Sequence, residues 1–232
     1  MRTATAIQHG RVRARRANPF PIAIPPAETD LRIARAVARN ADSTSQHIAR
    51  ALCWGADEKV LLVLAAAGWI VSRGRSEPLR RAGNHALLVT SAVSLLPHGL
   101  KLMFNQTRPD RRTVVGHVNG ISFSGKRRDA FPSGHALHMG ALASAAGPLP
   151  PGPRRAIQAL AVGLSLTRVV VLAHWPSDVV AGFALGAIVE RLLRRWTGYS
   201  SAMSQAGDQS SPKDLTECET SGPPPKMRAR AK

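Results

Sequence analysis

Residues 84–104 read NHALLVTSAVSLLPHGLKLMF, and this stretch decides the fold. Lys101, close to its end, is the one residue in the stretch that carries a permanent charge. A helix that crosses a bilayer needs about 20 mostly apolar residues, so we expect one long helix here. Shorter apolar stretches predict four more helices: residues 58–72, 133–147, 155–173 and 176–193. The sequence therefore predicts an all-α protein, a membrane-embedded bundle of five to six helices.

The charges lie between the apolar stretches rather than along them. The chain has 32 Lys and Arg against 14 Asp and Glu, a formal net charge of +18. Arginines gather at the ends of the predicted helices: Arg73, Arg75, Arg80, Arg81, Arg154, Arg155, Arg191, Arg194 and Arg195. This distribution is typical of helices that end at a membrane surface, whereas a helix of a soluble bundle carries a charged stripe. Because segments 58–72 and 133–147 are short, a soluble bundle with buried helices is the alternative.

The composition argues against several other functions. Aromatic residues make up 4% of the chain, with one tyrosine, so we do not expect a nucleic-acid binder that stacks bases on aromatic rings. Two cysteines, Cys53 and Cys218, are too few for a disulfide framework or a four-cysteine zinc site. The basic composition indicates a polyanionic partner, such as acidic lipid headgroups or a phosphate-bearing substrate.

Composition also divides the chain into four parts. Residues 1–29 are basic and rich in Pro, and residues 197–232 are rich in Ser, Pro and Gly, so both are predicted to be disordered tails. Residues 30–57 have an apolar face interrupted by arginines, which favours one or two amphipathic helices at a membrane interface, with Asp30 as N-cap. A sixth crossing by this segment is the weaker alternative. The catalytic helical bundle is predicted over residues 58–196.

Antiparallel helices would bring the unusual polar residues to one end of the bundle. If each apolar segment runs opposite to the one before it, segments 84–104 and 155–173 end where segments 133–147 and 176–193 begin. Ionisable residues in or beside apolar helices are costly and are therefore candidates for function. This end would also hold the Ser-Gly start of one helix and one loop arginine. The full set is Lys101, Arg108, Ser133, Gly134, His135, His138, Arg168, His174 and Asp178.

This set suits the chemistry of a phosphoryl group. Lys101, Arg108 and Arg168 supply three positive charges and many hydrogen-bond donors. Ser133 and Gly134 open a helix, whose free amides and dipole favour an anion. These five residues are therefore predicted to bind phosphate.

Two histidines and one carboxylate complete a set for nucleophilic catalysis. His174 and Asp178 are four residues apart, so the carboxylate is near enough to orient the imidazole as a nucleophile. His135 is placed to protonate the leaving oxygen. The sequence offers no Asp/Glu cluster for a magnesium or two-metal site, so we expect metal-free transfer through phosphohistidine and no cofactor. His138 and His98 are predicted to be structural.

The same residues resemble the three-part signature of the type 2 phosphatidic acid phosphatase (PAP2) superfamily, which also contains vanadium haloperoxidases. Its motifs are matched by Lys101-x6-Arg108-Pro109, by Pro132-Ser133-Gly134-His135 and by Arg168-x5-His174-x3-Asp178. The resemblance implies a helical membrane bundle with His174 as nucleophile, His135 as acid and Asp178 as orienter. The remaining five residues would form the phosphate cradle. Thr167 stands where the family usually has Ser before the motif arginine.

The expected function is hydrolysis of a phosphate or pyrophosphate monoester of a lipid, phosphatidate-like or isoprenyl. The resemblance leaves a vanadium haloperoxidase-like enzyme as one alternative, and the basic tails leave a non-enzymatic membrane- or nucleic-acid-binding protein as another. We expect a multi-pass protein of a bacterial inner membrane with its site on the exoplasmic, periplasmic face. Two basic groups would meet anionic headgroups: the tail arginines Arg11 to Arg16, and Lys126 to Arg128 with Arg111 and Arg112. A solvated charge run is the simpler interpretation of Lys126 to Arg128.

Overall fold

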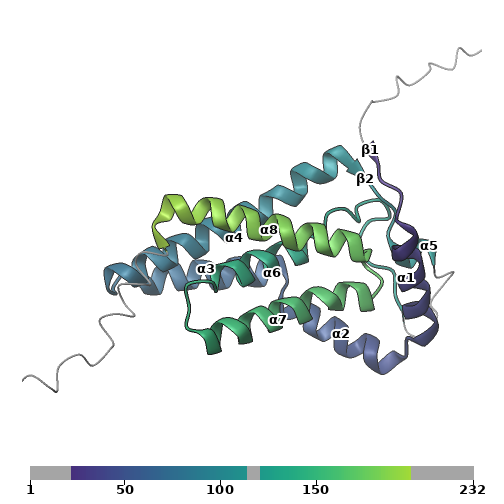
Figure 1. The fold of residues 1–232 in the computed structure, drawn as a ribbon, viewed down its shortest axis with the longest axis horizontal. Helices are drawn as coiled ribbons and strands as arrows, with labels where there is room; N and C mark the ends of the chain where they lie inside the picture. Colours follow the sequence, from purple (N-terminus) through teal and green to yellow (C-terminus); the bar gives the residue numbers. More distant parts are fainter. Residues whose placement is uncertain (1–21, 114–120, 200–232) are drawn as a thin grey trace, which may run out of the picture.

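The computed structural model describes residues 22–113 and 121–199 as a bundle of helices with one very short sheet (Figure 1). The arginines Arg11 to Arg16 and Cys218 lie outside the described residues. The elements in chain order are β1 (Ile22–Ala23), α1 (Glu28–Asn40), α2 (Ser43–Gly55), α3 (Glu58–Ser72), α4 (Glu77–Met103), β2 (Phe104–Asn105), α5 (Pro109–Arg112), α6 (Gly134–Ala145), α7 (Pro151–Val170) and α8 (Pro176–Thr197).

The five helices expected from the apolar stretches all form, and the all-α bundle is confirmed. Helix α3 has the expected bounds, whereas α4 begins seven residues earlier than expected, at Glu77. Glu77 forms ion pairs with Arg80 and Arg81 in the first turns, and Pro78 stands where a helix start tolerates proline. The apolar pattern alone does not show this polar first turn.

Helices α6 and α8 pack with their backbones in contact at the centre of the bundle. A Cβ added to Gly186 would lie 1.9 Å from the carbonyl oxygen of Leu137, and one added to Gly182 would lie 2.5 Å from that of Ser133. Small residues allow this close approach of two helices, as at helix interfaces within membranes. The contact sets the start of α6 against the start of α8, where the histidine motifs lie.

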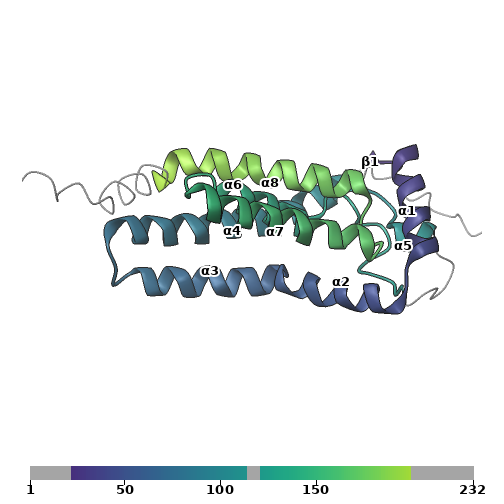
Figure 2. The same cartoon turned by 60° about the horizontal axis from the view of Figure 1, so that its bottom comes forward.

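The segment after residue 29 forms two helices, α1 and α2, and Figure 2 shows α2 and α3 end to end along one side of the bundle. Asp30 is not the N-cap of α1, because Ala27 holds that position. The Asp30 carboxylate instead accepts hydrogen bonds from the Ala27 amide at 3.1 Å and from the Ser177 amide and hydroxyl at 3.0 and 2.6 Å. Asp30 therefore ties α1 to the first turn of α8.

A two-residue strand pair joins the N-terminal region to the end of α4. Strand β1 runs parallel to β2, with Ile22 beside Phe104 and Ala23 beside Asn105. Residues 22–29, assigned from composition to a disordered tail, thus contain β1 and the first residues of α1. The pairing partner lies some 80 residues along the chain, so composition could not indicate it.

The outer surface of the bundle is strongly apolar. Helix α4 is long and apolar enough to cross a membrane, and among residues 22–113 and 121–199 it is the one helix that meets both criteria. Large apolar side chains that are at least 60% exposed are Trp54, Val63, Leu64, Ile70, Val71, Leu95, Leu102, Val180 and Trp196. An apolar surface of this extent marks contact with lipid or protein. Together with the length of α4, this surface favours association with a membrane.

Candidate active site

The expected site residues gather at one end of the bundle. The C-terminal ends of α4 and α7 and the N-terminal ends of α6 and α8 lie together there, beside α1 (Figure 1). A cavity of about 380 Å³ at this end is lined by six of the eight expected residues: Lys101, Arg108, Gly134, His135, Arg168 and His174. Ser133 and Asp178 are fully buried and do not line it. Antiparallel connectivity therefore predicted the juxtaposition correctly.

His174 stands in the turn between α7 and α8 with its ring buried. Its Nδ1 lies 2.6 Å from the carbonyl oxygen of Ala130, and a carbonyl only accepts hydrogen bonds, so Nδ1 carries the proton. The other ring nitrogen, Nε2, is left with a lone pair. Burial, with the nearby charges of Arg108 and Arg168, lowers the pKa of His174 well below its usual range. The imidazole is thus held neutral, as a nucleophile must be.

Asp178 does not orient His174 by a direct hydrogen bond. Its Oδ2 lies 3.9 Å from Nδ1 of His174, which is longer than a hydrogen bond. The same oxygen accepts a hydrogen bond from the Trp175 amide at 3.0 Å and so caps α8. The Asp178 backbone carbonyl accepts from the Ser133 amide at 3.3 Å. Asp178 therefore fixes the turn that carries His174 and joins it to the start of α6.

Arg108 is the most firmly held residue of the cradle. Its Nε donates to Asp129 at 2.8 Å and to the Lys126 carbonyl at 3.1 Å, and its Nη1 donates to the Ala173 carbonyl at 3.1 Å. Gly125, at φ +47°, leaves room for the guanidinium, since a Cβ there would lie 2.7 Å from Nη2. The loop before α6 thus presents Arg108 to the cavity in one orientation.

Asp129 is a further site residue, which no sequence motif marks. Its carboxylate lies between Arg108, at 2.8 Å, and Lys101, at 3.8 Å. It offsets part of the positive charge of the cradle and positions both cations. A single acid after the basic run 126–128 has no motif spacing to mark it, so the sequence carried no usable signal.

The start of α6 presents backbone and one imidazole to the cavity. Ser133 is the N-cap, with its hydroxyl 3.4 Å from the Ala136 amide, so its side chain is engaged by its own helix. Gly134 and His135 line the cavity. Two buried nitrogens here, Nε2 of His135 and Nε of Arg168, have no hydrogen-bond partner within residues 22–113 and 121–199. Buried polar atoms are normally paired, so both atoms are available to a ligand.

Helix α2 and its junction with α3 form a wall of the cavity that was not foreseen. Its lining residues are Arg50, Cys53, Trp54, Ala56, Asp57 and Glu58. Helix α2 is held against α7 by the Gln46 side-chain amide, which donates to the Val170 carbonyl at 2.7 Å, and by Cys53 Sγ, 3.1 Å from the Thr167 hydroxyl. Thr167, which replaces the usual Ser of the motif, thus contacts Cys53 of α2. Helix α2, in the segment expected at the membrane interface, therefore borders the site.

The remaining polar residues behave largely as expected. His138 is buried, with its ring nitrogens 3.0 Å from the Ser94 hydroxyl and 2.9 Å from the Gly134 carbonyl, and it also borders the cavity. His98 lies 2.9 Å from the Ser94 carbonyl. The side chains of residues 126–128 are exposed and absent from the cavity lining, which favours a solvated charge run.

This arrangement is suited to displacement at phosphorus. A neutral imidazole with a free Nε2 faces a cavity that also holds two guanidinium groups, an ammonium and a helix start, all of which favour an oxyanion. A second imidazole with an unpaired nitrogen is available to transfer a proton.

Known proteins similar to this chain are phosphatases. It is 39% identical over 118 residues to a lipid A 1-phosphatase of Rhizobium etli, covering 50% of this chain and 51% of that protein. It is 32% identical over 128 residues to a decaprenylphosphoryl-5-phosphoribose phosphatase of Mycobacterium tuberculosis, covering 55% and 66%. The chain thus spans about half to two thirds of the length of these relatives.

Two crystal structures share the fold at 18% sequence identity. The LpxE structure of Aquifex aeolicus superposes with a TM-score of 0.56, covering 74% of this chain and 98% of that one. A transmembrane PAP2 type phosphatidylglycerolphosphate phosphatase of Bacillus subtilis superposes with a TM-score of 0.51, covering 80% and 88%. The model of the PAP2 superfamily matches residues 82–202, just over half of the chain. Because that segment contains the whole cradle and both motif histidines, the chain belongs to the PAP2 superfamily.

Proposed function

We propose that the protein is a metal-independent phosphatase that hydrolyses a phosphate or pyrophosphate monoester of a lipid through a phosphohistidine intermediate. The observation that carries the proposal is the hydrogen bond of His174 Nδ1 to the Ala130 carbonyl. It leaves Nε2 as the nucleophile in a cavity lined by Lys101, Arg108 and Arg168. The relatives named above act on phosphates linked to lipids, which supports a lipid phosphate as substrate.

The reaction proceeds in two displacements at phosphorus. In the first, His174 Nε2 forms a bond to phosphorus, the bond from phosphorus to the lipid oxygen breaks, and His135 gives its proton to that oxygen. A bound phosphate brings negative charge beside His135 and so favours its protonated form. In the second, water attacks the phosphohistidine while His135 takes a proton from it, which releases phosphate and restores His174. The cations stabilise the charge on the equatorial oxygens in both steps.

The test uses purified protein and three substrates: phosphatidate, a lipid A-type phosphate and an isoprenyl pyrophosphate. His174→Ala should reduce phosphate release by at least about a thousand-fold, because the nucleophile is removed. His98→Ala is the matched control, since His98 contacts the Ser94 carbonyl and does not line the cavity. Unaltered release by a folded His174→Ala variant would overturn the mechanism.

We further propose a multi-pass protein of a bacterial inner membrane with its site on the periplasmic face. Basic loops favour the cytoplasmic side, and the loop between α3 and α4, at the opposite end of the bundle from the site, carries Arg73 and Arg75. In a variant without native cysteines, Arg128→Cys should react with an impermeant maleimide in intact cells and Ser76→Cys should not. The reverse pattern would invert the orientation.

A further inference from the structure

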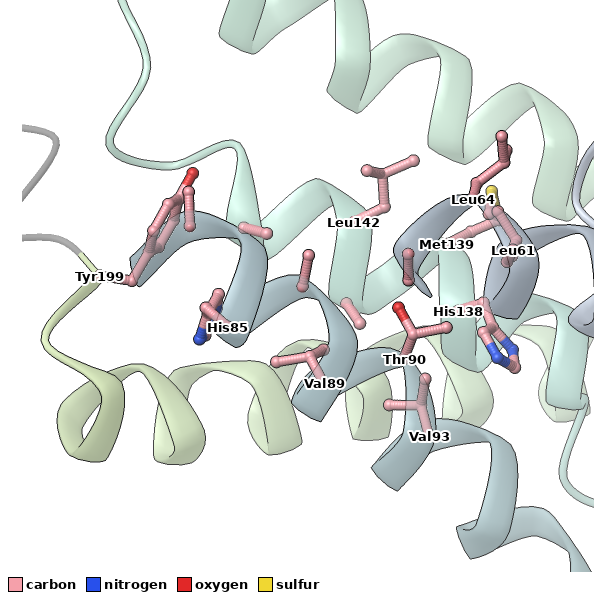
Figure 3. Close-up of a pocket in the computed structure, with 15 residues that line it drawn as sticks. Leu61, Leu64, His85, Val89, Thr90, Val93, His138, Met139, Leu142 and Tyr199 are labelled. Carbon is pink, nitrogen blue, oxygen red and sulfur yellow. The ribbon is translucent and has the colours of Figure 1, made fainter. Parts of the chain in front are cut away.

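A second cavity, of about 400 Å³, lies between α3, α4 and α6 (Figure 3). Its walls are almost entirely apolar, for example Leu61 and Leu64 from α3, Val89 and Val93 from α4, and Met139 and Leu142 from α6. His138 lines both this cavity and the site cavity. The apolar cavity therefore begins where the phosphate site ends.

The length of the apolar cavity matches one leaflet of a bilayer. Figure 3 shows His138 at one end and His85 with Tyr199 at the other. His138 contacts Ser94 of α4, and from Ser94 back to His85 the helix rises about 13 Å at 1.5 Å per residue. Half of a hydrocarbon core of about 30 Å is close to this length. The part of a chain that lies in this cavity would thus be about as long as one leaflet is thick.

An aromatic pair lines the far end of the cavity. The ring of Tyr199 stacks on that of His85, with centroids 4.6 Å apart and planes at 7°. His85 Nε2 lies 3.0 Å from a carboxylate oxygen of Glu190, and the Thr197 hydroxyl lies 2.8 Å from His85 Nδ1. The imidazole under Tyr199 is therefore fixed from both sides.

The network behind His85 is fully buried at its centre. Glu190 has no exposed surface, and its carboxylate also accepts hydrogen bonds from Arg194 Nε at 2.8 Å and from the Ser144 hydroxyl at 2.5 Å. Such buried charges are costly unless every partner is in place, and a satisfied network is rigid. The mechanism proposed above makes no use of it, because none of its residues lines the site cavity. The network instead holds His85, and with it the stacked ring of Tyr199, at the end of the apolar cavity.

We propose that this cavity binds an acyl chain of the substrate, and that Tyr199 stacked on His85 is the end wall that limits the length of the chain. The proposal rests on the proposed function, since it names the substrate class of the same site. It assigns the preferred substrate to acylated lipid phosphates with chains as long as one leaflet. A polyprenyl chain is several times longer and would meet the wall.

Two variants move the end wall in opposite directions. Tyr199→Ala removes the ring and lengthens the cavity. Ala86→Phe adds a ring beside the wall from an exposed position on α4, so it does not disturb the core. Trp196→Ala is the matched control, because Trp196 is an aromatic residue of α8 that is 87% exposed and does not line the cavity.

The measurement is kcat/KM for a series of phosphatidates with saturated chains from octanoyl to tetracosanoyl, with undecaprenyl phosphate as a further substrate. Tyr199→Ala should shift the optimum to longer chains and raise relative activity on the longest chains by about ten-fold, the discrimination that small changes of an apolar pocket provide. Ala86→Phe should shift the optimum to shorter chains, and Trp196→Ala should keep the wild-type profile. Tyr199→Phe, which keeps the ring, should keep the length limit.

The outcomes separate this proposal from the proposed function. If the wild type, Tyr199→Ala and Ala86→Phe all release phosphate with the same chain-length profile, the end wall is wrong. The proposed phosphatase activity is then unaffected. Higher kcat/KM of the wild type on undecaprenyl phosphate than on any phosphatidate overturns the acyl assignment. Wild-type protein that releases no phosphate from any lipid overturns both.

Discussion

The imidazole of His174 is held by the backbone carbonyl of Ala130, at 2.6 Å from Nδ1. The nucleophile is thus oriented by a neutral acceptor in the loop before α6, and the nearest carboxylate, that of Asp178, is 3.9 Å away. Asp178 is therefore not a direct hydrogen-bond partner of the imidazole.

Asp178→Asn should therefore be a mild substitution. An asparagine oxygen still accepts from the Trp175 amide and keeps the cap of α8, whereas Asp178→Ala loses that bond and should lower stability by about 1 kcal/mol. We expect kcat of Asp178→Asn to remain at least about a hundred-fold above that of His174→Ala. Steady-state kinetics and thermal unfolding in detergent give both numbers. If the two variants are equally inactive, the carboxylate acts on the imidazole directly.

Asp129→Asn should tighten the binding of phosphate. The carboxylate between Arg108 and Lys101 offsets their charge, and the amide that replaces it is neutral but still accepts from Arg108. We expect the inhibition constant of inorganic phosphate to fall by about ten-fold, equivalent to 1.4 kcal/mol, and kcat to fall as product release slows. Glu28→Gln, an exposed acid of α1, is the control. A weaker binding of phosphate would mean that Asp129 acts only by positioning the two cations.

The acid limb of kcat/KM should lie below the ordinary histidine pKa of about 6.5. The nucleophile reacts only when neutral, and burial with the charges of Arg108 and Arg168 lowers the pKa of His174. Activity is therefore retained as the pH falls through the usual histidine range and is lost below it. Arg108→Gln removes one of these charges, so its residual activity should show an acid limb at higher pH. A profile that does not move with this substitution would assign the limb to another group.

Gly186→Ala should strongly destabilise the bundle. Its new Cβ would lie 1.9 Å from the Leu137 carbonyl oxygen, so α6 and α8 would have to move apart, at a cost of about 3 kcal/mol or more. Gly163→Ala in α7 is the matched control, since nothing lies within 4 Å of its added Cβ, and it should be neutral or stabilising by up to about 1 kcal/mol. Yield and thermal unfolding of the two variants, measured side by side, check this. Equal stability of the two variants would show that α6 and α8 can move apart at little cost in free energy.

The local features of this protein could be predicted from its sequence because they depend on neighbours along the chain. The long apolar stretch within α4, the other apolar helices and the spacing of Lys101, His135 and His174 are all local patterns. Antiparallel packing of short-looped helices then suffices to bring the ends of α4 and α7 to the starts of α6 and α8.

Tertiary structure alone decided which atoms meet at that end. The acceptor for His174 is the carbonyl of Ala130, 44 residues away, and Asp129 meets Arg108, 21 residues away. The α2 wall depends on Gln46 meeting Val170, 124 residues apart. At the far end of the apolar cavity, His85 likewise meets Glu190, 105 residues away. Periodicity determines which residues form helices and which face is apolar. A single hydrogen bond between a distant loop and a helix end produces no periodic pattern in the sequence. Its partners are therefore determined only by how the helices pack.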